Sequence, residues 1–177
     1  ILGAQAANYR LTGKVKPRTG SRSTNSAPRN AYQTADGKWV CLSASTQAMT
    51  ERLFRAIGRP ELITDPRFAI NAERVKHAAL LDGIIGEFLG TMTQPDCVAF
   101  FDKAGVTIGP IYDISDIEQD PHFQARDIVV EIPDAEMGQI PVHNISPRLG
   151  GTPGAFRRAA PELGEHSVEA LRAAGLD

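Results

Sequence analysis

Three devices that redirect a polypeptide chain follow one another between Ala104 and Arg126. Gly105 closes a helical pattern and accepts the left-handed conformation that helix C-termini often need. The pair Gly109-Pro110 then requires a turn or an extended link, because proline fixes its own φ and disfavours a helical residue before it. A short helix should begin after Asp113 and end before Asp120-Pro121. The span therefore predicts a rigid corner between a helix-rich half and a strand-rich half.

The remaining elements predict an α+β fold. Asp36-Gly37 is a hairpin signal between the segments 30–34 and 38–43, which alternate as strands do. Residues 1–11 are compatible with a helix that stops at Gly13. Three further helices are predicted over 46–57, 81–89 and 93–104, from apolar residues at spacings of three and four, with Ser45 or Thr46 as the cap of the first and Thr93 as the cap of the last. Beyond the corner we expect strands over 128–132 and 139–142, and a last helix over 167–174.

Composition sets limits on partners and location. The chain has 177 residues, of which 42% are apolar and 23% charged, and its net charge of −2 predicts neither nucleic-acid nor membrane-surface binding. No apolar run approaches the roughly 18 residues of a membrane helix. Cys41 and Cys97 lack metal-type companions and are predicted to be buried free thiols, which suits the reducing cytoplasm.

Common catalytic signatures are absent from the sequence: it has no G-x-G-x-x-G, no G-x-x-x-x-G-K-[ST], no H-E-x-x-H and no G-x-S-x-G. The four histidines fall on separate predicted elements, so no metal site is expected. His166 beside Glu165 is an acid–base candidate, although capping or surface hydrogen bonding is the simpler interpretation. Residues 20–29, GSRSTNSAPR, form either a solvated linker or a loop whose amides and arginines bind an oxyanion.

Five segments in the same order resemble the class III CoA-transferase family, which includes formyl-CoA transferase, carnitine CoA-transferase and α-methylacyl-CoA racemase and was formerly labelled L-carnitine dehydratase/bile-acid-inducible protein F. The similarity runs almost end to end and rests on their order, since no single segment is specific. The segments are NAYQTADGKWV (30–40), LFRAIGRPELITDPRFAINAERV (53–75), AGVTIGPI (104–111), DPHFQARDIVVEI (120–132) and PELGEHSVEAL (161–171).

The resemblance implies a chain that is the C-terminal part of a longer protein. In the family, a small α+β domain is carried between two linkers of a large Rossmann-like domain, and two chains interlock as a homodimer. On this basis residues 1–27 are a linker from the large domain, residues 28–117 are the small domain, and residues 118–177 return toward the large domain.

The resemblance also implies chemistry on CoA thioesters, without a metal. In the family an aspartate attacks an acyl-CoA, CoA is held as an aspartyl thioester, and a carboxylic acid then takes it over. That aspartate lies upstream of Ile1, so no residue here inherits a catalytic role and the chain alone is expected to be inactive.

The substrate-binding candidates that the resemblance implies are a loop and a corner. They are Asn25, Ser26, Ala27 and Pro28, in a loop that closes over the intermediate, together with Gly109 and Pro110. The matching stretch STNSAP (23–28) is not glycine-rich as it is in formyl-CoA transferase, which counts against formyl transfer and leaves the acyl group open. Two alternatives stand beside transfer: an acyl-CoA racemase of the same family, and a non-catalytic module that interlocks a dimer.

Overall fold

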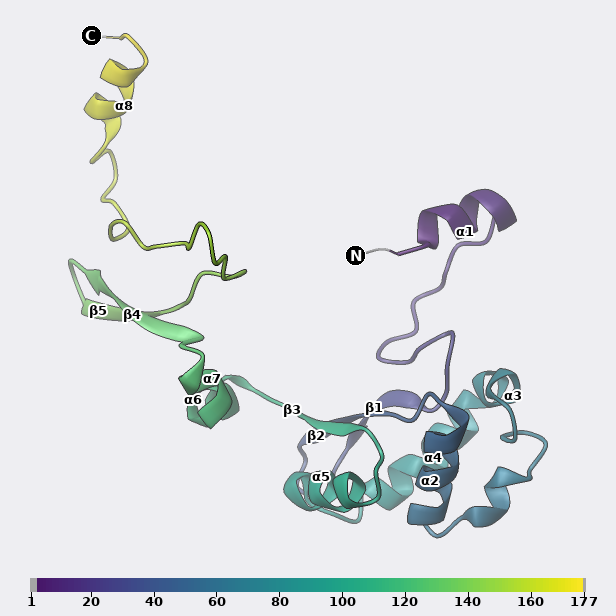
Figure 1. Ribbon diagram of the computed structural model, residues 1–177. Coiled ribbons are helices and arrows are strands. Elements are labelled where there is room, and N and C mark those ends of the chain that lie inside the picture. Colours follow the sequence, from purple (N-terminus) through teal and green to yellow (C-terminus); the bar gives the residue numbers. More distant parts are fainter. Residues whose placement is uncertain (1–2, 177) are drawn as a thin grey trace. The chain divides into compact units, whose positions relative to one another are not determined.

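The computed structural model describes residues 3–176, which divide into two compact units (Figure 1). The first unit ends at Ile111 and the second begins at Tyr112. Helix α1 (Gln5–Thr12) ends at Gly13, as predicted, while Ile1 and Leu2 of the predicted helix lie outside the described residues. The domain boundaries at residues 27 and 117 stay predictions.

A three-stranded antiparallel sheet organises the first unit, in the order β1-β2-β3. Its strands are β1 (Arg29–Gln33), β2 (Trp39–Ser43) and β3 (Ile108–Ile111). The predicted hairpin is therefore confirmed. The pair Gly109-Pro110 lies inside β3, so of the two predicted alternatives, a turn or an extended link, the structure has the extended one. The edge position of β3 explains this result, since proline is tolerated in an edge strand, where its missing N–H is not needed for pairing.

Helices α4 (Ala78–Leu89) and α5 (Gln94–Lys103) pack against one face of this sheet (Figure 1). The unit also contains α2 (Gln47–Ala56), the 3₁₀ helix η1 (Pro60–Ile63), which contacts α2, and α3 (Asn71–Lys76), which contacts α4. The expected caps are present: the Thr46 hydroxyl accepts the Met49 N–H, and the Thr93 hydroxyl accepts the Asp96 N–H. Gly105 follows α5 with φ of 66°, the left-handed conformation predicted for it.

The hydrophobic core lies between this sheet face and the helices. It takes alternate residues from β2 and one stripe from each long helix, as the binary patterns predict. The buried apolar residues of the cluster are Tyr32, Val40, Leu42, Ala44, Leu53, Phe54, Ile57, Leu62, Phe68, Leu81, Ile85, Leu89, Cys97, Phe101 and Val106.

The other face of the sheet is open. Val40 and Leu42 point into the core, so Cys41 between them must point away, and it is exposed. The prediction of two buried thiols is therefore right for Cys97 and wrong for Cys41.

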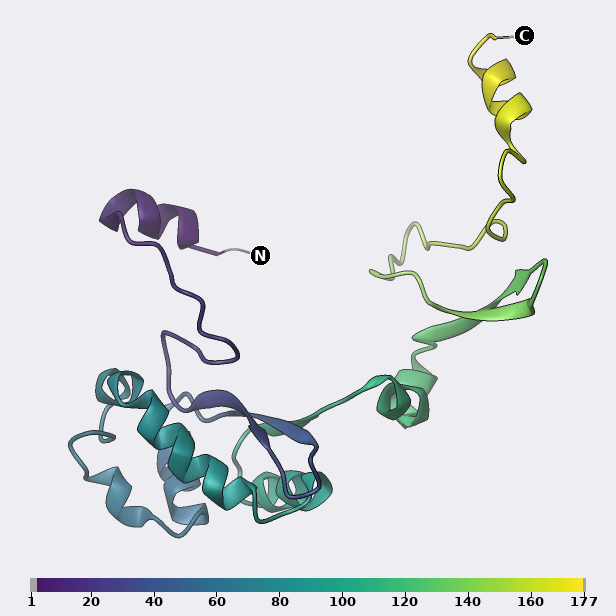
Figure 2. The ribbon, with the colours of Figure 1, turned by 180° about the vertical axis from the view of Figure 1, so that it is seen from behind.

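The second unit consists of short helices and one β-hairpin (Figure 2). They are α6 (Ile114–Gln119), α7 (Pro121–Ala125), β4 (Val129–Asp134), β5 (Gly138–His143) and α8 (Ser167–Ala173). Asp113 caps α6 in a capping box with Asp116, as its position predicts. The unpredicted α7 is capped by Asp120, whose carboxylate accepts the N–H groups of His122 and Phe123. No described residue of this unit is buried.

Candidate functional site

A groove of about 480 Å³ runs over the open face of the sheet in the first unit. The residues that line the groove form rows across the strands. Register partners on neighbouring strands make up one row, and the next row on the same face lies two residues further along each strand. Arg29 of β1 lies opposite Ser43 of β2, whose N–H donates to the Thr107 carbonyl at 3.0 Å. This row gives one end of the groove a guanidinium and two hydroxyls.

The next row forms a floor of small side chains. Ala31, Cys41 and Gly109 are register partners across the three strands, and all three line the groove. A Cβ added at Gly109 would meet only the Cys41 sulfur, at 3.8 Å. Ile111 lines the groove one row further on. The groove thus has a polar end, a shallow centre and an apolar end.

Arg29 is the single charged side chain among the described residues that line this groove. No described carboxylate pairs with it, whereas Arg22, in the preceding loop, is bound to Asp82. The arrangement favours an anionic group at the polar end, since a guanidinium and hydroxyls all donate hydrogen bonds.

The loop before β1, which holds Asn25 to Pro28, is fixed from helix α3. The Asn71 side chain binds both sides of the loop: its Nδ2 donates to the Asn25 carbonyl at 3.0 Å and its Oδ1 accepts the Ala27 N–H at 3.2 Å. One turn later, Arg74 Nε donates to the Ala27 carbonyl at 2.7 Å. These three hydrogen bonds fix the loop backbone while the Asn25 residue stays exposed.

Arg74 is the largest fully buried residue of the first unit, with 1% exposure. Its Nη1 also donates to the Phe68 carbonyl at 2.9 Å and to Gln47 Oε1 at 3.0 Å. Burial lowers the pKa of this guanidinium, yet an arginine stays charged at neutral pH. A buried cation without a directly paired carboxylate is therefore held by neutral acceptors.

A chain of hydroxyls connects the loop to the groove. Ser26 Oγ donates to Ser45 Oγ at 3.3 Å, and Ser45 Oγ lies 3.0 Å from Ser43 Oγ. Ser43 belongs to the polar row of the groove. The structure thereby places Ser26 next to the polar end, and Gly109 in the floor, of one site.

The other candidates have different positions. Ala27 is 4% exposed and Pro28 is buried, so their side chains face the protein interior. Pro110 is the register partner of Val40, whose side chain points into the core. Of the six predicted site residues, Asn25, Ser26 and Gly109 are those that the loop and groove present outward.

The carboxylate of Asp82, on α4, accepts hydrogen bonds from three side chains in and just before β1. It accepts Arg22 Nε at 2.5 Å, Asn30 Nδ2 at 3.0 Å and the Tyr32 hydroxyl at 2.7 Å. Arg22 is therefore paired with Asp82 and is not a free cation, as the oxyanion-loop hypothesis for residues 20–29 would need. Arg29 remains available, at the end of the same loop.

Burial, reinforced by the hydrogen bond to Asp82, raises the pKa of Tyr32 far above its usual value near 10. Folded Tyr32 keeps its proton at a pH where the unfolded chain loses it, so the free energy of unfolding should fall as pH rises above about 10, by up to about 1.4 kcal/mol per pH unit.

We expect Tyr32→Phe to remove this part of the slope in urea unfolding followed between pH 9 and 11. The control Tyr9→Phe, at an exposed position, should retain it. A Tyr32→Phe profile parallel to that of the unaltered chain would show that the phenol does not titrate on unfolding.

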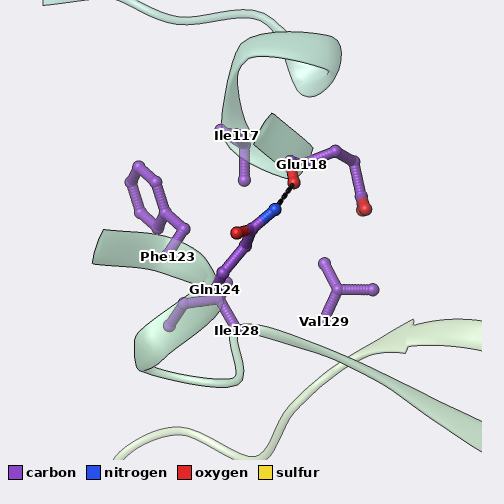
Figure 3. A pocket seen from close by; sticks show the side chains of 6 residues that line it. All are labelled: Ile117, Glu118, Phe123, Gln124, Ile128 and Val129. Carbon is purple, nitrogen blue, oxygen red and sulfur yellow. Dashed lines mark hydrogen bonds between the residues drawn. The ribbon is translucent and has the colours of Figure 1, made fainter. Parts of the chain in front are cut away.

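A separate hollow in the second unit is too small for a substrate (Figure 3). It measures about 60 Å³ and lies among α6, α7 and the start of β4. Gln124 Nε2 crosses it to donate to the Glu118 carbonyl at 2.8 Å, and apolar side chains form the remainder of the lining (Figure 3).

The acid–base candidate pair His166–Glu165 has no direct contact among the hydrogen bonds and ion pairs of the described residues. His166 Nδ1 lies 4.0 Å from Glu169, while Glu165 accepts the Glu162 N–H. Across residues 3–176 there is no group of three or more side chains placed to hold a metal ion. In the same part of the chain, no helix combines the length and apolar character needed to cross a membrane.

Asn71, Arg74 and Asp82 were not predicted as site-building residues. Asp82 follows Leu81, which belongs to the apolar stripe of α4. A carboxylate next to such a stripe was the one feature of the sequence that could have indicated a buried hydrogen-bond acceptor here. Asn71 and Arg74 occupy a polar segment, NAERVK, that gives no such signal.

Comparisons with known proteins bear on the whole chain. The model of CoA-transferase family III matches residues 1–167. The succinyl-CoA–D-citramalate CoA-transferase of Chloroflexus aurantiacus is 38% identical over 96% of this chain and 42% of its own length. The succinate–glutarate CoA-transferase of Agrobacterium fabrum is 29% identical over 97% of this chain and 42% of its own length.

Solved structures agree with the sequence comparisons. A CAIB/BAIF family protein from Brucella suis, 30% identical, matches with a TM-score of 0.74 over 98% of this chain and 44% of its own. The chain therefore spans about two fifths of the length of the relatives it matches.

Proposed function

The chain belongs to CoA-transferase family III, and we propose that it supplies the C-terminal part of an enzyme that moves CoA from an acyl-CoA thioester to a carboxylic acid. The family match over residues 1–167 carries the proposal. The relatives described above are named as CoA-transferases, which favours transfer over the racemase alternative.

The proposed reaction proceeds through a carboxylate nucleophile outside residues 1–177. An aspartate attacks the thioester carbonyl and releases CoA thiolate, which leaves a mixed anhydride. The thiolate attacks the aspartyl carbonyl of this anhydride, forming aspartyl-CoA and releasing the donor acid. The acceptor carboxylate then attacks the aspartyl-CoA thioester, which releases CoA thiolate and forms a second mixed anhydride. The thiolate attacks the acceptor carbonyl of this anhydride, which releases the new acyl-CoA and the free aspartate.

Within this scheme the Asn25–Pro28 loop covers the intermediate. Hydrogen bonds from Asn71 and Arg74 already fix the loop backbone, so the loop around the exposed Asn25 would lose little conformational freedom on contact with the intermediate. A loop held in this way can exclude water from an aspartyl thioester, which water would otherwise hydrolyse.

The second unit supports an assembly role within the same enzyme. Val130 pairs with Val142, and Ile132 with Ile140, so one face of the β4–β5 hairpin is apolar, yet none of its residues is buried. We propose that other parts of an interlocked homodimer cover this face. The two free thiols fit the proposed cytoplasmic location.

The test compares the full product of the gene with residues 1–177 alone. We expect the full product to transfer CoA from succinyl-CoA to a dicarboxylic acid acceptor, followed by separation of the CoA esters, and residues 1–177 to show no transfer. Turnover by residues 1–177 would place the nucleophile within this chain. A full product that transfers CoA between no pair of acids would contradict the proposed activity.

A further inference from the structure

The chain that leads from α1 into β1 is held on the first unit by two separate sets of side-chain contacts. In the downstream set, Asn71 and Arg74 bind the backbone of the Asn25–Pro28 loop. In the upstream set, Arg22 Nε donates to the Asp82 carboxylate at 2.5 Å. The two sets differ in what their release would leave behind.

Release of the downstream set would leave buried groups without partners. Arg74 is 1% exposed, and it donates to the carbonyls of Ala27 and Phe68. Asn71 would lose its contacts with both sides of the loop. A buried donor or acceptor that loses its partner costs the whole desolvation free energy of that group, so we expect these contacts to persist for as long as the unit is folded.

Release of the upstream set leaves the remaining groups paired. Without the arginine, Asp82 still accepts the Asn30 side-chain N–H at 3.0 Å and the Tyr32 hydroxyl at 2.7 Å. Ser21, which donates to Asn30 Oδ1, leaves with the arginine, and that oxygen keeps the N–H of the next residue at 2.9 Å. The Arg22 side chain is 44% exposed, so water replaces its ion pair at little cost in free energy.

The chain between the two sets can move as one piece. The Thr19 hydroxyl donates to the Arg22 carbonyl at 2.9 Å, and the Arg22 N–H donates to the Thr19 carbonyl at 3.3 Å, so this part of the chain forms a turn of its own. After the turn, the Ser23 N–H donates to the Arg29 carbonyl at 3.4 Å, a long and therefore weak hydrogen bond. No side chain of residues 19–24 is buried.

We propose that residues 19–24 form a releasable strap. The Arg22–Asp82 ion pair closes it, and loss of this pair lets the strap swing away from β1 while the Asn25–Pro28 loop stays in place. The loop that is proposed to cover the intermediate therefore does not have to move when the chain before it does. The strap depends on the fold of the first unit alone and operates in the same way whichever reaction the protein catalyses.

Opening of the strap has two structural consequences. Ser21 lines the sheet groove in the closed position, so opening takes this residue out of the lining. Residues 13–18, which precede the strap, make no hydrogen bond or ion pair to the sheet or to helices α2–α5 within the described chain. An open strap adds up to about 20 Å to this unbound segment, which gives the sheet and its helices a wider range of positions relative to α1.

Relaxation of ¹⁵N nuclei in the labelled chain measures the opening directly. We expect order parameters of about 0.85 over residues 19–27 of the unaltered chain, which is the value of a rigid backbone. Arg22→Gln should lower those of residues 19–24 below about 0.6 and leave those of residues 25–27 unchanged. Arg18→Gln, at an arginine without an ion pair in the described chain, removes the same charge and should change neither range. Equal mobility of both ranges in Arg22→Gln, no change in either, or a strap that is already mobile in the unaltered chain would each overturn the proposal.

Limited digestion with trypsin tests the same motion without a substitution. Trypsin takes up the arginine side chain at the bond that it cleaves, so cleavage after Arg22 requires its release from Asp82, whereas cleavage after Arg18 does not. Raising NaCl from about 0.05 M to about 0.5 M screens the exposed ion pair and should raise the ratio of cleavage after Arg22 to cleavage after Arg18 at least about 5-fold, measured by mass spectrometry. A ratio that does not change with salt would show that the ion pair does not close the strap.

Discussion

Replacing Arg74 with methionine is expected to lower the free energy of unfolding by about 3–5 kcal/mol, measured by urea denaturation followed by circular dichroism. The guanidinium is 1% exposed and donates to the carbonyls of Ala27 and Phe68. Methionine fills much of the space but leaves both carbonyls without a donor, and each buried unsatisfied acceptor costs about 1–3 kcal/mol. The Asn25–Pro28 loop should loosen in the same variant.

The control for Arg74 is Arg67→Met, at an exposed arginine that pairs with Asp65. It should change the free energy of unfolding far less than Arg74→Met does, because exposed ion pairs contribute little. Arg74→Lys should fall between the two, since an ammonium restores the charge but fewer of the hydrogen bonds. If Arg74→Met were as stable as Arg67→Met, the buried hydrogen bonds would not stabilise the fold as we infer.

Removing residues 112–177 is expected to leave the first unit folded, with an unfolding free energy within about 1 kcal/mol of that of the whole chain. All buried apolar residues of the described chain lie before residue 112. Residues 112–177 alone should show no cooperative thermal transition, because an isolated two-stranded hairpin is at most marginally stable in water.

Calorimetry on the two pieces and hydrogen exchange on the whole chain measure this difference. Amides of β2 and α4 should exchange through global unfolding, and those of β4 and β5 through local opening at much lower cost. A cooperative transition in residues 112–177, or an unfolded 1–111 piece, would contradict the inference that the first unit contains the hydrophobic core.

The sequence predicted well what is determined locally. Thr46, Thr93 and Asp113 cap helices because a short polar side chain at a helix start satisfies N–H groups only two or three residues away. The β1–β2 hairpin likewise followed from Asp36-Gly37 and the alternation around it. The short helices α3 and α7 were missed, since five or six residues give too few turns for a periodic pattern.

The groove, and the hydrogen bonds that hold the Asn25–Pro28 loop, depend on residues distant in sequence, which no local pattern could join. Arg74 lies 47 positions from Ala27, and Asp82 lies 60 positions from Arg22. Gly109 faces Cys41 only because β3 adds to the hairpin as an edge strand, whereas the sequence left a turn and an extended link open at this point. The family resemblance gave the loop as a candidate, and the oxyanion-loop hypothesis already included Arg29. The sheet groove came from strand register.

Mapping the covalent CoA adduct tests the central claim, that this chain encloses the intermediate while the nucleophile lies outside it. The full gene product is incubated with succinyl-CoA, treated with borohydride or hydroxylamine to convert the aspartyl thioester to a stable derivative, digested and analysed by mass spectrometry. We predict one modified aspartate, located outside residues 1–177. A modified aspartate or glutamate within residues 1–177 would contradict the account.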